Sequence, residues 1–349
     1  MVLVKAKRDE LLGPLSAVSG IIERRHTLPI LSNVLIERGA VESAGEARSL
    51  TVGARKLVDI LRALPESAEV TLQLQDKRLL VKAGKSKFVL QTLPAEDFPR
   101  LAKPAGDVAR FSLKQKDLRR LLGLVQYSMA QQDIRYYLNG LLMVVEEKTL
   151  KLIATDGHRL AFASMALDAK LPRQEVIVPR KTVLELGKLL SDGDAEVRIE
   201  LSTTQASFSF GSVELVSKLV DGKFPDYTRV IPVGHKNQLS IGREVLRQSL
   251  MRAAILSNEK FRGVRWVLTD GNLKIVSSNT EQEEAEETIE VGYKGDALDI
   301  GFNVNYLLDV LNNVAGTEVE CRFGDAASSA LLSFPSEADF KYVVMPMRI

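Results

Sequence analysis

Hydrophobic and polar residues follow the same order in three stretches of the chain. Each stretch opens with a short alternating segment, which predicts a strand. It continues with apolar side chains every three or four positions, which predicts an amphipathic helix. The stretches begin at Lys5, Phe111 and Leu239. The apolar stripes of these helices are Leu11, Leu15, Val18 and Ile22 in the first stretch, Leu118, Leu121, Leu122 and Val125 in the second, and Leu246 and Leu250 in the third. A threefold internal repeat therefore organises the chain.

Each repeat contains a second amphipathic segment, followed by short strand-like segments with turn residues between them. The predicted helices lie within residues 8–23, 55–64, 114–127, 180–190, 243–254 and 304–314. Two helices and several antiparallel strands per repeat predict an α+β fold of three similar domains. The segments PAGDVAR and PVGHKNQ are typical of linkers. We therefore predict domains over residues 1–110, 111–236 and 237–349.

The first repeat is shorter than the second. Asn33 and Arg55 are 22 positions apart, whereas the corresponding Asn139 and Arg180 are 41 positions apart. The difference amounts to one β-hairpin, which is lacking near residues 38–51, and the polar segment ERGAVESAGEARS (37–49) stands in its place. A natural deletion would expose a sheet edge. We favour the interpretation that residues are omitted from the sequence here, because a sheet that loses a hairpin must repack its core.

Composition excludes several classes of protein. Of 349 residues, 45% are hydrophobic and 26% charged, which is typical of globular domains and not of a disordered chain, a collagen or a coiled coil. No apolar run is long enough to span a membrane, and the segment MVLVKAKRDELLG is too charged for a signal peptide. A single cysteine, Cys321, cannot form an internal disulfide. A reducing cytoplasm is therefore the predicted location.

Catalytic and cofactor motifs are missing from the sequence. Three histidines and one cysteine do not provide a zinc site with standard spacing. The segment AGKS at 83–86 lacks the first glycine of a phosphate loop, and no GxSxG, GxGxxG or HExxH occurs. Asp156 and His158 are the one candidate catalytic pair, but ATDGH is also typical of a turn between two strands. We predict no catalytic residue, no metal and no cofactor.

Positive charge is concentrated in the predicted helices. Their windows hold 14 Lys and Arg against 8 Asp and Glu, in a chain whose net charge is +2. The strands and loops are therefore acidic on balance. If the repeats place their helices on a common side, that side is a basic surface suited to phosphates without base readout.

Several segments, in this order, resemble the bacterial sliding clamp family, the β subunit of DNA polymerase III. They include HTLPILSN (26–33), QQDIRYYLNG (131–140), ATDGHRLA (154–161), SKLVDGKFPDY (217–227), AAILSNEKFRGVR (253–265) and YVVMPMRI (342–349). The resemblance implies three similar DNA-clamp domains per chain, and a head-to-tail dimer that forms a six-domain ring. Twelve helices would line the hole, and double-stranded DNA would be held topologically. The implied activity is that of a processivity factor, without catalysis.

The resemblance also implies which residues bind DNA. They are Arg25, Arg55, Gln132, Tyr136 and Tyr137. Arg25 follows a predicted helix and Arg55 opens one, so both suit phosphate contacts. The alternative for the two tyrosines is that they pack the start of a strand.

A hydrophobic peptide-binding cleft between the second and third domains is implied as well. It accepts a segment with a glutamine and a pair of large apolar side chains. The implied partners are the α subunit of the replicative polymerase, the clamp loader, and other polymerases and repair proteins. The matching residues are Thr155, Gly157, His158, Arg159, Leu160, Pro225, Arg229, Val230, Asn303, Tyr306, Val343, Val344, Met345, Pro346, Met347 and Arg348. The apolar chain end also fits a last core strand, and methionines suit a groove that adapts to several partners.

The implied subunit contact joins the first domain of one chain to the third domain of the other. Phe88, Ile255 and Leu256 occupy the matching positions. Lys85 and Lys87 would face the acidic run at 283–287, and such pairs steer association more than they strengthen it.

Two other functions compete with a clamp. A hydrolase using Asp156 and His158 would lose turnover in His158→Ala, whereas a clamp would have no turnover to lose and would bind peptide more weakly. A sequence-specific DNA binder would hold a short linear duplex tightly, whereas a clamp slides off linear DNA.

Overall fold

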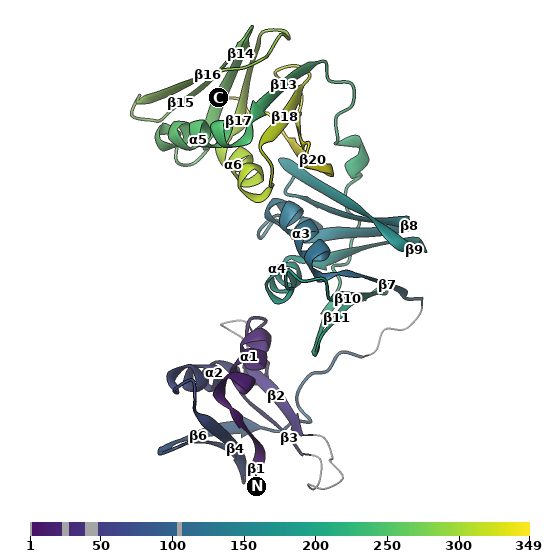
Figure 1. Cartoon of the computed structure of the whole chain (residues 1–349), viewed down its shortest axis with the longest axis vertical. Helices are drawn as coiled ribbons and strands as arrows, with labels where there is room; N and C mark the ends of the chain where they lie inside the picture. Colours follow the sequence, from purple (N-terminus) through teal and green to yellow (C-terminus); the bar gives the residue numbers. More distant parts are fainter. Residues whose placement is uncertain (1, 23–27, 39–47, 103–106) are drawn as a thin grey trace. The chain divides into compact units, whose positions relative to one another are not determined.

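The computed structural model describes residues 2–22, 28–38, 48–102 and 107–349. The chain divides into two compact units, Met1–Lys103 and Pro104–Ile349 (Figure 1). The first unit holds the first repeat, and the second unit holds the other two. The predicted domain end at residue 110 falls just inside a strand that begins at Ala109.

The first unit is one antiparallel sheet with two helices. Its elements are β1 (Val2–Lys7), α1 (Arg8–Ser19), β2 (Asn33–Arg38), β3 (Arg48–Gly53), α2 (Ala54–Ala63), β4 (Glu69–Gln75), β5 (Arg78–Ala83) and β6 (Ser86–Leu93). The strand order is β1-β4-β5-β6-β3-β2. Helix α2 buries Leu57 and Leu61 completely, as their stripe predicts, and they join a core with Val70, Leu79 and Val81 from the sheet.

The short connection of the first repeat joins two strands that pair directly. β2 and β3 run antiparallel from Asn33 opposite Gly53 to Arg38 opposite Arg48. Residues 39–47, where we expected an omission, lie outside the described residues. The two strands that flank this stretch pair along their whole described length.

The second repeat has the same order of elements, with a longer central pair of strands. Its elements are β7 (Ala109–Lys114), α3 (Gln115–Val125), β8 (Gly140–Thr155), β9 (Arg159–Pro179), α4 (Arg180–Leu189), β10 (Glu196–Leu201), β11 (Gln205–Phe210) and β12 (Val213–Lys218). β8 and β9 form a long hairpin, at the place where the first repeat has the shorter pair β2 and β3. The remaining strands form a sheet in the order β12-β11-β10-β7.

The third repeat splits the corresponding long strands into shorter ones. Its elements are β13 (Asn237–Gly242), α5 (Arg243–Ala253), β14 (Gly263–Thr269), β15 (Asn272–Ser278), β16 (Glu284–Glu290), β17 (Leu298–Asn303), α6 (Val304–Asn313), β18 (Glu318–Phe323), β19 (Ala330–Phe334) and β20 (Glu337–Val344). One sheet has the order β16-β15-β14-β17.

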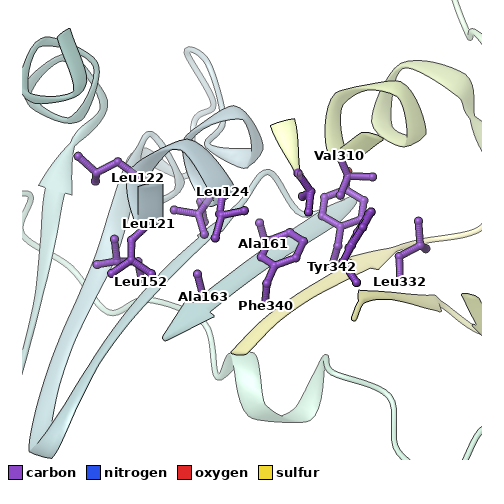
Figure 2. Close-up of a cluster of buried hydrophobic side chains, with 14 of the residues drawn as sticks. Leu121, Leu122, Leu124, Leu152, Ala161, Ala163, Val310, Leu332, Phe340 and Tyr342 are labelled. Atoms are coloured by element: carbon purple, nitrogen blue, oxygen red, sulfur yellow. The ribbon is translucent and has the colours of Figure 1, made fainter. Parts of the chain in front are cut away.

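The second and third repeats share a sheet, in the order β13-β18-β19-β20-β9-β8. Strand β20 pairs with β9, from Phe340 opposite Ala163 to Val344 opposite Arg159. Figure 2 shows Phe340 and Tyr342 beside the small side chains of Ala161 and Ala163. Tyr342 is fully buried, so this seam, the paired part of β9 and β20, belongs to the hydrophobic core.

The sequence predicted the helices closely. Helices α1 to α6 all lie within the predicted windows or begin one residue before them. The segment ATDGH contains the turn between β8 and β9, as its Asp-Gly pair predicts. None of the helices in the described ranges is long and apolar enough to cross a membrane.

Candidate functional site

A cavity of about 250 Å³ opens beside the seam of β9 and β20. Its lining combines the turn after β8, the start of β9, the end of β20 and two loops. The lining residues are Arg135, Tyr137, Leu138, Thr155, Gly157, Arg159, Leu160, Phe224, Pro225, Tyr227, Val230, Val343 and Met345. We call this cavity the cleft. The structure brings eight of the predicted cleft residues together here: Thr155, Gly157, Arg159, Leu160, Pro225, Val230, Val343 and Met345.

The floor of the cleft is a small apolar cluster. Leu138, Leu160, Phe224 and Val343 are all buried and belong to one group of packed side chains. Leu160 and Val343 are opposite each other in the ladder of β9 and β20. Because both strands are held by this ladder, the floor is rigid and apolar.

One wall comes from the loop before β13. Tyr227 starts a short 3-10 helix, Tyr227–Arg229, where the Asp226 side chain accepts a hydrogen bond from the Thr228 backbone. The Tyr227 ring stacks on Phe162 with centroids 6.0 Å apart. These contacts fix Tyr227 and the neighbouring Pro225 at the cleft wall.

The polar edge of the cleft is the tight turn between β8 and β9. Asp156 Oδ1 accepts hydrogen bonds from the backbone N–H groups of His158 and Arg159, at 2.9 and 3.1 Å. Gly157 has a φ of +89°, and an added Cβ would lie 2.9 Å from the Arg135 guanidinium. The backbone conformation therefore favours glycine here, and a side chain would also displace the Arg135 guanidinium.

Arg135 is held over this turn by a carboxylate. Its Nε and Nη2 donate to the two oxygens of Asp133, at 3.0 and 2.8 Å, and Nη2 also donates to the Asp156 carbonyl. Hydrogen bonds from the Arg135 side chain lower the pKa of Asp133 to about 2. The guanidinium therefore stays positioned at the cleft edge across the physiological pH range.

Arg159 connects the cleft to helix α6 and to the core. Its Nε donates to Asp156 at 3.0 Å, Nη1 to Asp309, and Nη2 to the Tyr127 carbonyl at 2.7 Å. Its guanidinium carbon lies 4.5 Å from the centroid of the Tyr306 ring. With only 9% of its side chain exposed, Arg159 is a structural hub as well as part of the lining.

The other predicted cleft residues do not line the cavity. They are His158, Arg229, Asn303, Tyr306, Val344, Pro346, Met347 and Arg348. His158 and Tyr306 stack on each other next to the turn, with ring centroids 6.4 Å apart. The Asn303 side chain caps α6 by accepting from Asn305, and Val344 is buried in the core. None of these eight residues lines the cavity, so their contact with a partner protein stays a prediction.

The competing hydrolase lacks a catalytic pair. The Asp156 carboxylate is occupied by two backbone N–H groups and by Arg159. The His158 ring instead stacks on Tyr306. Among the hydrogen bonds of the described residues, none joins the His158 ring to Asp156. This geometry does not activate a nucleophile.

Family models match the chain in three consecutive pieces. They are the C-terminal, central and N-terminal domains of the DNA polymerase III beta subunit, matching residues 228–348, 112–226 and 38–102. A curated beta sliding clamp of Pseudomonas aeruginosa is 47% identical over 365 aligned positions, covering 98% of this chain and 99% of that protein. The chain belongs to the beta sliding clamp family. It is a DNA sliding clamp of replication, a non-catalytic subunit of the polymerase.

Other clamps agree with this assignment. The beta sliding clamp of Escherichia coli K12 is 45% identical over 362 positions, covering 98% of this chain and 99% of that protein. A crystal structure of the P. aeruginosa clamp bound to griselimycin has a TM-score of 0.93 at 46% identity, and the match covers all of both chains. The 365 aligned positions of the first relative exceed the 349 residues of this chain, so that clamp has residues where this one has gaps.

The predicted DNA contacts of this clamp lie in separate places. Arg25 is outside the described residues. Arg55 is exposed at the start of α2, and its Nη2 lies 3.4 Å from the Ile22 carbonyl. Gln132 and Tyr136 are exposed in the loop before β8, while Tyr137 lines the cleft. The tyrosine rings pack edge to face, with centroids 5.9 Å apart.

Basic residues on the clamp helices differ in whether they are paired. In α3, Lys116 pairs with Asp194, Arg119 with Asp192, and Arg120 with Glu337. In α2, by contrast, Arg55, Lys56 and Arg62 form no ion pair with a described residue. Acidic neighbours therefore offset much of the charge of α3, whereas the charge of α2 is not offset in this way within the described ranges.

The predicted dimer residues are accessible, each in its own unit. Ile255 is 76% exposed after α5, Leu256 is half-buried beside it, and Phe88 is half-buried on β6. In the acidic run, Glu286 already pairs with Lys274, and Glu287 with Arg252.

Sequence reasoning missed five cleft residues: Arg135, Tyr137, Leu138, Phe224 and Tyr227. Tyr137 was predicted to contact DNA instead. All five lie in segments that resemble the family, QQDIRYYLNG and SKLVDGKFPDY. The aromatic and apolar side chains in these segments, next to Pro225, were the available signal.

Proposed function

We propose that this clamp encircles duplex DNA as a head-to-tail dimer and tethers partner proteins through the cleft. The cleft carries the proposal, because it joins an apolar floor, an aromatic wall and a polar edge at the junction of two repeats. Partners would include the α subunit of the replicative polymerase, the clamp loader, and other polymerases and repair proteins. The predicted setting is the cytoplasm, where replication takes place.

The size of the cleft suits side chains more than a whole ligand. Small-molecule sites occupy about 300–1,000 Å³, whereas the cleft is about 250 Å³. A peptide could place one or two large apolar side chains on the floor while its backbone stays outside. A glutamine of the same peptide would find hydrogen-bond partners at the turn around Gly157. Met345 is half exposed at the rim, and its flexible side chain suits partners of different shape.

DNA binding needs no specific base contact in this proposal. Arg25, Arg55, Gln132, Tyr136 and Tyr137 stay the proposed contacts. The charges of Arg55, Lys56 and Arg62 on α2, which form no ion pair with the described residues, suit phosphates. Contacts of this kind are equivalent at every phosphate, so the ring can slide. Tight readout of bases would hold the protein in place instead.

The repeat supports the proposed dimer. Within the chain, the part of β9 at Arg159–Ala163 pairs with β20, the last strand of the next repeat. In the third repeat β16 holds the place of that part of β9, and it ends its sheet. The last strand of the first repeat is β6, which carries Phe88. Pairing β16 of one protomer with β6 of its partner would reproduce the seam between two chains.

Peptide binding at the cleft can be tested with one matched pair of variants. Met345 and Met251 are 46% and 47% exposed, but only Met345 lines the cleft. Met345→Ala should weaken binding of a fluorescent polymerase-tail peptide by about five- to tenfold, since roughly 1 kcal/mol of apolar contact is lost. Met251→Ala should leave the affinity unchanged. Equal affinities for both variants and the unmodified clamp would contradict the assignment of the cleft.

A further inference from the structure

The last five residues of the clamp leave the shared sheet and cross to a second one. Met345 N donates to the His158 carbonyl at 2.9 Å, and Met347 N donates to the Gly301 carbonyl at 2.8 Å. Met347 and Gly301 form an isolated antiparallel bridge. The tail, residues 345–349, is therefore fixed at one end on the turn after β8 and at the other on β17.

Two glycines form the surface on which the tail lies. A Cβ added to Gly301 would overlap the Met347 carbonyl oxygen and would lie 2.8 and 2.9 Å from Ile349 side-chain atoms. A Cβ added to Gly263, on the neighbouring strand β14, would lie 3.1 and 3.2 Å from the same side chain. Neither glycine has a positive φ, so what distinguishes these positions is the close approach of the tail and not the backbone conformation.

The two close approaches differ in how easily they could be relieved. At Gly263 the only crowded group is the end of a flexible side chain, which can turn away. At Gly301 a backbone carbonyl stands in the way, and it can move only if the tail moves. A third glycine of the same repeat, Gly292, has no atom within 4 Å of an added Cβ.

The position of the tail affects the position of Met345 in the cleft, because the chain that connects them is short. Only Pro346 separates Met345, at the cleft rim, from Met347, on Gly301. The proline ring fixes one of the two backbone angles of that residue. A displacement of Met347 is therefore transmitted to Met345.

We propose that Gly301 is a positioning residue for peptide binding: its missing side chain lets the tail dock on β17, and the docked tail holds Met345 at the cleft. Gly263 assists by leaving room for Ile349. The inference rests on the proposed function of the cleft, and it gives the GFNV segment at 301–304 a role outside the cavity.

Three glycine variants of the full-length clamp test the proposal. Peptide affinity is measured by fluorescence anisotropy, with the same labelled polymerase-tail peptide. Gly301→Ala should weaken binding by about tenfold, Gly263→Ala by about two- to threefold, and Gly292→Ala not at all. If the unmodified clamp does not bind the peptide, the proposed function fails. If it binds, and Met345→Ala weakens binding while Gly301→Ala does not, the inference alone is overturned.

Removal of Met347–Ile349 distinguishes positioning from general damage to the sheet. In a chain ending at Pro346, nothing remains over Gly301, so Gly301→Ala should cause no further loss of affinity. If Gly301→Ala unfolds the full-length clamp, the shortened chain with the same substitution should fold again. An equal loss of affinity or of folding in both backgrounds would show that the substitution acts through β17 itself, and would overturn the inference.

Discussion

Strands β12 and β20 hold the same place in successive repeats but have different neighbours. β20 pairs with β19 on one side and with β9 on the other. β12 pairs with β11 and forms the edge of its sheet in the described part of the chain. The comparison shows that the outer partner of a last strand is supplied by the preceding repeat.

The partner of β20 belongs to the long hairpin of β8 and β9. The corresponding connection in the first repeat, between β2 and β3, has only nine residues. Open edges invite added strands. In the proposed dimer β16 uses its open edge, and β6 uses the part before Thr92, where its pairing with β3 begins.

The largest effect is expected where a free edge is used by a second protomer. Ile255→Ala combined with Leu256→Ala should turn the dimer into monomers at micromolar concentration. Two apolar side chains contribute about 3–6 kcal/mol per interface, or roughly 10²- to 10⁴-fold in affinity. Molecular mass by light scattering measures the result, and Val233→Ala, at a residue 90% exposed outside the proposed contact, is the control. A dimer mass that persists in the double variant rejects this interface.

A smaller but still large effect should separate the seam from the open edge. Tyr342→Ala on β20 removes a fully buried ring from the seam and should cost about 3–5 kcal/mol. Val216→Ala on β12, at a residue 36% exposed, should cost no more than about 0.5 kcal/mol. Urea unfolding followed by the fluorescence of Trp266, the single tryptophan, reports on the third repeat. A similar loss of unfolding free energy in both variants would mean that the seam contributes no more to stability than the open edge does.

The sequence predicted those features of the fold that depend on a local pattern of residues. Apolar spacing placed all six described helices, and Asp-Gly identified the turn at Gly157, because these signals lie within a few residues. The shortness of the first repeat was also visible, from the spacing of Asn33 and Arg55. The pairing of β20 with β9 was not, because strand pairing between repeats joins residues that are far apart in the chain.

The candidate site was predicted only in part, for a similar reason. Resemblance supplied eight lining residues, but Arg135 and Phe224 approach the turn only after folding. The hub role of Arg159 depends on Tyr127 and Asp309, which lie 32 and 150 positions away from it. The docking of the tail on Gly301 likewise depends on residues that are far apart in the sequence. The spacing of apolar residues along the chain therefore does not predict it.

The smallest effect concerns an ion pair that crosses the seam. Arg120 and Arg119 are neighbours on α3, and their side chains are 43% and 42% exposed. Arg120 pairs with Glu337 on β20, in the third repeat. Arg119 pairs with Asp192 of its own repeat. Glu337 is only 17% exposed, whereas Asp192 is 83% exposed, so water screens the Glu337 pair less. Arg120→Met should therefore cost up to about 1 kcal/mol of unfolding free energy by the Trp266 signal, and Arg119→Met close to nothing. The cost should shrink in 1 M NaCl, where the Debye length falls to about 3 Å. If both variants lose the same free energy, or if salt does not reduce the loss, the pair adds nothing to the seam beyond an ordinary surface contact.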